Sequence, residues 1–214
     1  MPDTLPSSLS RLQPVQSRAA STLSTLLLSA ARVVHAVGAE RLTSDLVAVS
    51  SGFSIGTVYR YFEDRMHILD ALGKNNLEQF TVDCLHKISP RRNPTWIDAF
   101  GSVFDYLETE FATQPGFRSI RFGDHLDSRL RLRGESNLDT AAISLVIKLG
   151  DNYPTIIETG ILDRVEGALH LYDAMLGRAF AFEEGGDTRM IADARQISIG
   201  YLTAAQPVNP TTHP

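Results

Sequence analysis

The chain has 214 residues, of which 43% are hydrophobic and 21% are charged, and its formal net charge is −5 at pH 7. This composition is typical of a globular protein with one large domain or two small ones. The single cysteine, Cys84, excludes an internal disulfide framework, and the segment before Ser17 lacks the cationic start and apolar core of a signal peptide. We therefore expect a cytoplasmic protein with no membrane-spanning segment.

Charge is distributed unevenly along the chain. Residues 1–67 contain six arginines and five carboxylates, so this segment has a net charge of +1 and the remainder has −6. Nucleic-acid binding requires a basic surface for the phosphates. The overall acidity therefore argues against a nucleic-acid partner for most of the chain, but not for its first third, where the arginines are free to cluster.

Residues 1–16 contain three prolines and many small polar residues, and we expect a disordered N-terminal arm there. The arm is either a solvated tail or a segment that follows a DNA groove with Arg11 and Arg18. From Ser21 a helix is predicted, which Gly38 ends. Its apolar residues recur every three or four positions, as in a helix with one buried face; they are Leu23, Leu27, Ala30, Val34 and Val37.

Two short helices follow, joined by a tight turn. Thr43 is the expected cap of the first, whose predicted buried side consists of Leu46, Val47 and Val49. Gly52 permits a left-handed turn, and Ser54 is a suitable cap for the second helix. On that helix the positions able to pack inward are Ile55, Val58 and Phe62. With the longer helix before them, these elements predict a helix-turn-helix.

The remainder also has helical periodicity. A connecting helix is expected from Asp64 to Ile88, and Asn93 followed by Pro94 predicts the cap and first residue of the next helix. Further helices are predicted over 118–132, 138–152, 162–183 and 188–204. Because no strand-like alternation occurs, we predict an all-α fold.

Residues 26–72, "LLLSAARVVHAVGAERLTSDLVAVSSGFSIGTVYRYFEDRMHILDAL", resemble the DNA-binding domain of TetR-type transcriptional regulators. The features that match in order and spacing are Ala30, Ala31, Gly38, Thr43, Ala48, Gly52, Ser54, the run Gly56-Thr57-Val58-Tyr59, Phe62 and Arg65. The resemblance implies a helix-turn-helix DNA-binding domain over 17–66, a helical effector-binding and dimerisation domain over 67–204, and a flexible tail over 205–214. It covers less than a quarter of the chain.

The same resemblance implies a set of DNA-binding residues on the two short helices and beside them. They are Thr43, Ser54, Ile55, Thr57, Tyr59, Arg60, Tyr61 and Arg65. Ser54, Thr57 and Arg60 are the better candidates for base edges, and the others for phosphates. Ile55 departs from the family, which often has lysine there, and it either contacts a thymine methyl or is buried. The structural alternatives are half-buried tyrosines, solvated arginines and a threonine that is only a cap.

Aromatic residues of the second domain are expected either to fill a core or to line an apolar effector cavity of the kind found in the resembling family. The candidate effector-pocket residues are Trp96, Phe100, Phe104, Phe117, Phe122, Tyr153, His170 and Met175. The effector is predicted to be a small molecule of unknown identity.

Small residues at helical spacing in the last two helices allow close helix packing. By the resemblance they form a homodimer interface of four helices, and the alternative is an intrachain core. The candidate interface residues are Gly167, Leu171, Ala174, Gly177, Arg178, Ala181, Ala194 and Ile197.

Catalytic and metal-binding signals are weak. His35, His67, His86, His125 and His170 have no metal-ligand spacing, and no motif pairs a nucleophile with a base. We expect no cofactor, no metal and no enzymatic activity. The function implied is that of a repressor that binds a palindromic double-stranded DNA operator and that a small-molecule effector releases. The alternatives are an activator, a regulator controlled by a protein partner, and a helical ligand-binding protein or enzyme with an unused helix-turn-helix head.

Overall fold

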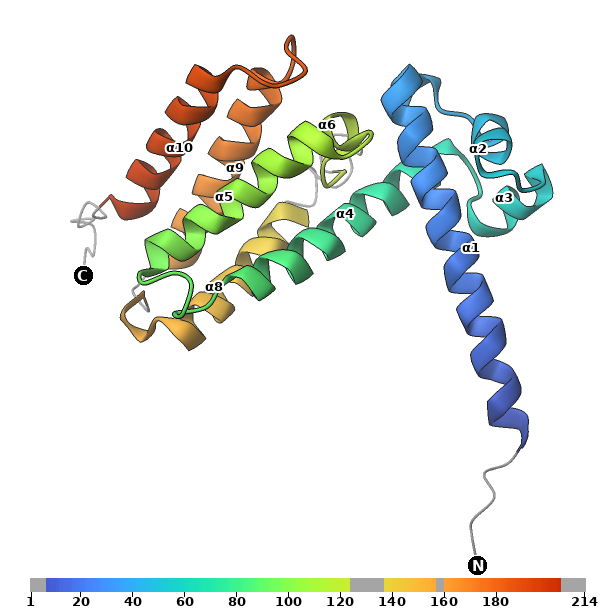
Figure 1. Ribbon diagram of the computed structural model, residues 1–214, viewed down its shortest axis with the longest axis horizontal. Helices are drawn as coiled ribbons and strands as arrows, with labels where there is room; N and C mark the ends of the chain where they lie inside the picture. Colours follow the sequence, from blue (N-terminus) through green and yellow to red (C-terminus); the bar gives the residue numbers. More distant parts are fainter. Residues whose placement is uncertain (1–6, 124–136, 157–159, 205–214) are drawn as a thin grey trace, which may run out of the picture.

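The structure is a computed structural model that describes residues 7–123, 137–156 and 160–204, with side chains from Arg18 onward. All regular structure in these ranges is helical, which confirms the predicted all-α class (Figure 1). The helices form two units, a small head at one side and a larger body, and α4 (Arg65–Lys87) runs from one to the other.

The head consists of α1 (Ser7–Val37), η1 (Ala39–Arg41), α2 (Ser44–Ser51) and α3 (Ile55–Tyr61). These helices and the start of α4 enclose one apolar core, whose fully buried members include Leu26, Ala30, Leu42, Val47, Val58, Phe62 and Ile68. The helix-turn-helix is therefore held by its own core.

Helix α1 begins earlier than predicted. Apolar periodicity indicated a start near Ser21 and an arm over 1–16, whereas the helix runs from Ser7 and so includes residues 7–16. The prolines and small polar residues over 1–16 favoured an arm, although Leu9, Leu12 and Val15 recur there every three positions.

Part of α1, residues 18–37, is long and apolar enough to span a membrane by length and composition alone. In the structure, Leu26, Ala30 and Val34 of this segment are buried in the head core. Packing within the head accounts for these buried residues, whereas Leu28 and Val37 of the same segment are 49% and 37% exposed.

The body contains α5 (Trp96–Thr113), α6 (Phe117–Ile120), α8 (Asn137–Asn152), η2 (Pro154–Ile156), α9 (Ile161–Ala179) and α10 (Thr188–Thr203). Its core is rich in aromatic residues, and the rings of Phe104 and Tyr172 stack with centroids 3.9 Å apart. Helices α9 and α10 lie side by side, on the opposite side of α5 from α4 (Figure 1). The predicted helix over 118–132 is confined to 117–120 in the described part, and residues 124–136 lie outside it.

The start of α5 differs from the prediction in its cap. Thr95 is the N-cap, and it forms a reciprocal capping box with Asp98. Asn93 is buried instead, where its Nδ2 donates to Ser102 Oγ at 2.9 Å and its carbonyl accepts from the Tyr153 hydroxyl at 2.7 Å. The residue predicted to cap the helix therefore holds the loop before it.

Helix α6 lies where head and body meet. Its Ile120 is buried in the head core, and Gly116 just before it has φ 75°. A Cβ placed on Gly116 would lie 2.7 Å from the carbonyl oxygen of Ala31 in α1. On the other side, the side-chain amide of Asn76 in α4 donates to the carbonyl of Arg121 at 2.7 Å. The body thus contacts both helices that carry the head.

Candidate nucleic-acid interface and junction pocket

The turn between α2 and α3 is set by three local features. The Thr43 hydroxyl accepts a hydrogen bond from the Leu46 amide at 3.2 Å, and Gly52 ends α2 with φ 74°. The Ser54 hydroxyl accepts from the Thr57 amide at 3.2 Å and lies 3.0 Å from the Thr57 hydroxyl. Because each cap satisfies an otherwise unpaired helix N–H, the start of α3 is well defined.

Helix α3 has one buried side and one exposed side. Val58 and Phe62 are buried in the head core, as predicted. Tyr59 is 55% exposed, Arg60 is exposed, and a Cβ placed on Gly56 would meet no atom closer than 4.0 Å. The exposed side therefore combines a phenol, a guanidinium and a stretch of bare backbone, which suits an approach to a groove and its phosphates.

Ile55 lies on the exposed side rather than in the core. Its side chain is 37% exposed, so the interpretation of Ile55 as an inward-packing residue is wrong. Ile55 is the first residue of α3, one helical turn before Val58 and two before Phe62. It leaves a branched apolar group beside Gly56 and Tyr59.

Two predicted DNA-contact residues have partners inside the head. The Tyr61 hydroxyl donates to the Ala19 carbonyl of α1 at 3.3 Å, and Arg65 Nη1 donates to the Glu40 carbonyl at 2.6 Å. The guanidinium of Arg60 lies over the Tyr61 ring, 5.3 Å from its centroid. Tyr61 and Arg65 thus help to fix the positions of α1, η1 and α4.

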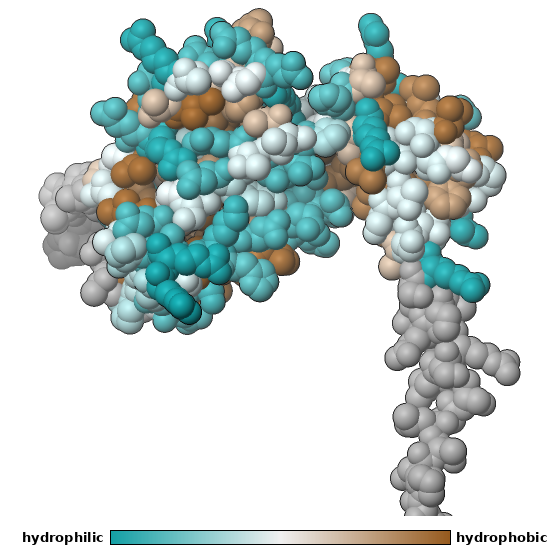
Figure 2. All heavy atoms as spheres, in the orientation of Figure 1, coloured by the Kyte–Doolittle hydropathy of each residue, from teal (hydrophilic) through white to brown (hydrophobic). Residues whose placement is uncertain are grey.

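Helix α2 exposes two apolar residues that the sequence pattern predicted to be buried. Val47 is buried, but Leu46 is partly exposed and Val49 is 82% exposed, so the predicted burial of these two residues is wrong. Helix α2 spans only eight residues, and its buried side is completed by Ala48 rather than by larger residues. Figure 2 shows the visible face of the head as mostly pale and brown, whereas the visible face of the body is mostly teal.

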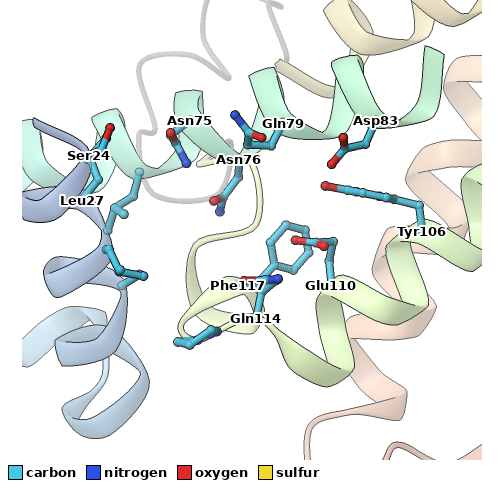
Figure 3. Close-up of a pocket in the computed structure, with 14 residues that line it drawn as sticks. Ser24, Leu27, Asn75, Asn76, Gln79, Asp83, Tyr106, Glu110, Gln114 and Phe117 are labelled. Carbon is cyan, nitrogen blue, oxygen red and sulfur yellow. The ribbon is translucent and has the colours of Figure 1, made fainter. Parts of the chain in front are cut away.

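A pocket of about 290 Å³ lies between head and body (Figure 3). Helices α1, α4 and α5, the turn before α6 and the first residue of α6 provide its lining, which consists of Ser24, Leu27, Leu28, Ala31, Leu72, Asn75, Asn76, Gln79, Asp83, Tyr106, Glu110, Gln114, Pro115 and Phe117. Phe117 is the one residue of the predicted effector set in this lining. We call this cavity the junction pocket.

Three polar side chains meet at one end of the junction pocket. Figure 3 shows Asp83 and Tyr106 turned toward each other, with Glu110 nearby. Burial and the neighbouring Asp83 carboxylate raise the pKa of Glu110 to about 7, although Lys87 and the Tyr106 hydroxyl oppose the shift. Burial also raises the pKa of Tyr106. The two carboxylates therefore repel each other in a partly desolvated site.

The other predicted effector residues lie within or around the body core. Phe100, Phe104, Phe122 and Tyr153 are buried there, and Trp96 and Met175 pack against the same cluster. His170 lies on the surface of α9, with Nε2 2.7 Å from Asp139 Oδ1. This packing matches the core alternative for the aromatic residues.

Three residues of the predicted dimer interface make contacts within the chain. A Cβ placed on Gly167 would lie 2.5 Å from the Tyr201 ring of α10, and one on Gly177 would lie 2.7 Å from the Arg121 guanidinium. Ala194 is fully buried. The exposed members are Leu171, Ala174, Arg178, Ala181 and Ile197. Tyr201, which is 45% exposed and absent from the predicted set, extends this surface on α10.

Within the part of the chain that the structure describes, no group of three or more His, Cys, Asp or Glu residues is placed to hold a metal ion. Burial raises the pKa of the Cys84 thiol well above its ordinary value, so it stays protonated at neutral pH.

Comparisons with known proteins match both units. Residues 26–72 match the family model described as bacterial regulatory proteins, tetR family, and residues 94–206 match that of the tetracyclin repressor-like, C-terminal domain. The chain is similar to the crystal structure of a TetR-family transcriptional regulator from Streptomyces coelicolor, with 25% identity and a TM-score of 0.71. That similarity covers 86% of this chain and 96% of the other. No curated protein matched the chain.

Proposed function

The chain belongs to the TetR family of transcriptional regulators, and on that premise we propose that it is a repressor that binds a palindromic operator as a homodimer and is released by a small-molecule effector. The observation that carries the DNA-binding part is the exposed side of α3. Tyr59 and Arg60 extend from a helix whose opposite side is fixed by Val58 and Phe62 in the head core. A recognition helix must be held rigidly on one side and present polar groups to the major groove on the other.

In the proposed complex, Arg60 contacts a guanine edge or a phosphate, Thr57 contacts a base edge, and Ile55 contacts a thymine methyl. Thr43 and Tyr59 contact phosphates and set the register. Tyr61 and Arg65 act mainly by holding α3 and α4 against the rest of the head, since each is bonded to a backbone carbonyl there. Ser54 caps α3 and, in the proposed complex, also contacts a base edge.

A homodimer supplies two such heads. The exposed residues of α9 and α10, with Leu171, Ala174 and Ile197 among them, are the proposed interface. In a two-fold dimer, heads about 34 to 36 Å apart read half-sites separated by one helical turn.

Effector release requires that the effector bind one head spacing better than the other. If the free energies of effector binding to the two conformations differ by about 1 to 3 kcal/mol, the effector changes operator affinity about 5- to 150-fold. Helix α4 is the proposed lever because its N-terminal residues Ile68 and Leu69 are buried in the head core while Phe80 and Cys84 are buried in the body core.

The experiment that tests DNA reading is selection of bound fragments from a random double-stranded DNA pool at two salt concentrations. Native protein is compared with the double variant Arg60→Ala, Tyr59→Phe and with Arg91→Ala, which changes an exposed arginine beyond the body end of α4, outside the head and outside α9 and α10. We expect a palindrome that the native protein and Arg91→Ala enrich and that the double variant loses. No enrichment by folded native protein would contradict the proposal and favour a ligand-binding protein with an unused head.

A further inference from the structure

The junction pocket is shared by the head and the body. Ser24, Leu27, Leu28 and Ala31 of α1 form one side, and α4, α5 and the turn before α6 form the other. Figure 3 shows Ser24 and Leu27 at the end opposite Asp83 and Tyr106. A molecule in this pocket therefore contacts the DNA-binding unit directly, without transmission through the body core.

The lining has a definite chemical character. It contains two carboxylates, four carboxamides and two hydroxyl groups, and none of its residues is a lysine, arginine or histidine. Its apolar members, Leu27, Leu28, Ala31, Leu72 and Phe117, come mainly from α1 and its neighbours. Asp83 and Glu110 thus lie at one end of the pocket, and Leu27 lies at the other end together with Ser24 (Figure 3).

The acidic end lacks sufficient positive charge of its own. The charged and titratable groups around Glu110 are Asp83, the neutral thiol of Cys84 and Lys87 from α4, and Tyr106 from its own helix, whose hydroxyl is hydrogen-bonded at the carboxylates. The residues of α1 and of the 114–117 segment that line the pocket are uncharged. The Lys87 ammonium lies over the Tyr106 ring at 5.1 Å, and one cation cannot balance two carboxylates. A second cation between Asp83 and Glu110 would relieve their repulsion.

We propose that the junction pocket binds a small organic cation, whose ammonium group lies between Asp83 and Glu110 and whose apolar part contacts Leu27 and Leu28 of α1. This assignment rests on the proposed function, since it identifies the chemical class of the effector and the place where it acts. The cavity volume, about 290 Å³, is at the low end of the range for ligand pockets and fits a compact amine. The carboxamides of Asn76 and Gln79 supply further oxygen acceptors for the ammonium hydrogens.

The test uses a matched pair of probes on the full-length protein. Binding of 4-phenylbutylamine, a cation throughout the pH range used, is compared with that of 4-phenylbutan-1-ol by isothermal titration calorimetry. We expect the amine to bind at least tenfold more tightly than the alcohol at pH 8, the scale of a charge-assisted hydrogen bond. Between pH 8 and pH 6 the affinity for the amine falls at least threefold as Glu110 gains a proton, and the affinity for the alcohol stays constant.

Variants locate the site. Asp83→Asn and Glu110→Gln each reduce the affinity for the amine at least fivefold and leave the alcohol unaffected. The matched controls are Asp70→Asn and Glu78→Gln, which change exposed or part-exposed carboxylates on α4 outside the pocket lining. Circular dichroism confirms that each variant is folded, and the comparison of the two probes on native protein needs no variant.

Equal binding of the amine and the alcohol, or equal loss in the pocket and control variants, overturns the inference. The operator obtained by selection separates this failure from that of the proposed function. An enriched palindrome without amine preference leaves the repressor proposal intact and removes the cation site. Amine preference at Asp83 and Glu110 without any enriched DNA keeps the cation site and contradicts the repressor proposal.

Discussion

We expect that adding one methyl group at Gly116 disrupts the contact between the head and the body. Its φ is 75°, a conformation that L-residues rarely adopt, and a Cβ there would lie 2.7 Å from the Ala31 carbonyl oxygen and 3.4 Å from Val34 Cβ. Gly52 provides a matched control, because its φ is 74° but a Cβ there would meet no atom within 4 Å. Gly116→Ala and Gly52→Ala therefore share the backbone strain and differ in the clash.

The strain of a left-handed alanine costs about 1 kcal/mol at either position. At Gly116 the 2.7 Å contact is with the backbone of a packed helix, so relief requires movement of α1 or α6. Inserting a group into a closed contact costs about 1 to 3 kcal/mol. We expect Gly116→Ala to lower the free energy of unfolding by about 2 to 4 kcal/mol and Gly52→Ala by about 1 kcal/mol.

Urea denaturation followed by far-UV circular dichroism measures both values. Asparagine, which tolerates the left-handed region, sharpens the comparison: Gly52→Asn should restore most of the stability lost in Gly52→Ala, whereas Gly116→Asn should not, since its Cβ meets the same carbonyl. If Gly116→Ala and Gly52→Ala lower the free energy of unfolding by amounts that agree within about 0.5 kcal/mol, the close contact between α1 and the body is refuted.

Three further changes probe the same architecture. The pKa of Glu110 is raised in the folded state, so the free energy of unfolding falls as pH rises from 4.5 to about 7. The difference in free energy of unfolding between Glu110→Gln and native protein, measured by urea denaturation, should therefore favour the variant by roughly 1 to 2 kcal/mol more at pH 8 than at pH 4. A difference that does not change with pH would contradict the raised pKa of Glu110. Gly73→Ala should lower the free energy of unfolding by more than about 2 kcal/mol, because its Cβ would lie 2.8 Å from the Phe122 carbonyl oxygen. Gly167→Ala should lower it by less than about 1 kcal/mol, because the partly exposed Tyr201 ring can rotate away. The reverse order of the two losses in thermal melts would be inconsistent with these contacts. Arg60→Ala should cost about 1 to 3 kcal/mol of affinity per head and relax the base preference at one position of each half-site of the selected operator. An unchanged base preference, measured by fluorescence anisotropy on substituted operators, would remove Arg60 from the base edges.

Local signals in the sequence were sufficient for the turn between α2 and α3. Thr43 and Ser54 carry short side chains that accept from the amides three residues later, and Gly52 adopts the left-handed conformation that its lack of a Cβ allows. Each interaction is made within one helical turn, so residue type and spacing determine it. The two errors on α2, Leu46 and Val49, arose because apolar character alone does not say which side of a short helix is covered.

The junction pocket escaped sequence interpretation for a physical reason. Asn76, Gln79 and Asp83 recur at three and four on α4, which is also the pattern of a solvated helix face. Tyr106 and Glu110 show the same spacing on α5. Only the crossing of these helices beside α1 turns the two polar stripes toward each other and partly removes them from water.

The sequence by itself thus determined the helical class, the helix-turn-helix and the identity of its exposed polar groups, because hydrogen bonds and periodicity within single helices control these features. The tertiary structure decided which aromatic residues fill the body core, which glycines close helix contacts, and where a partly desolvated acidic pocket forms. Those outcomes depend on contacts between residues far apart in the chain, such as Asn76 with Arg121 and Gly116 with Ala31, and no local pattern encodes such distances.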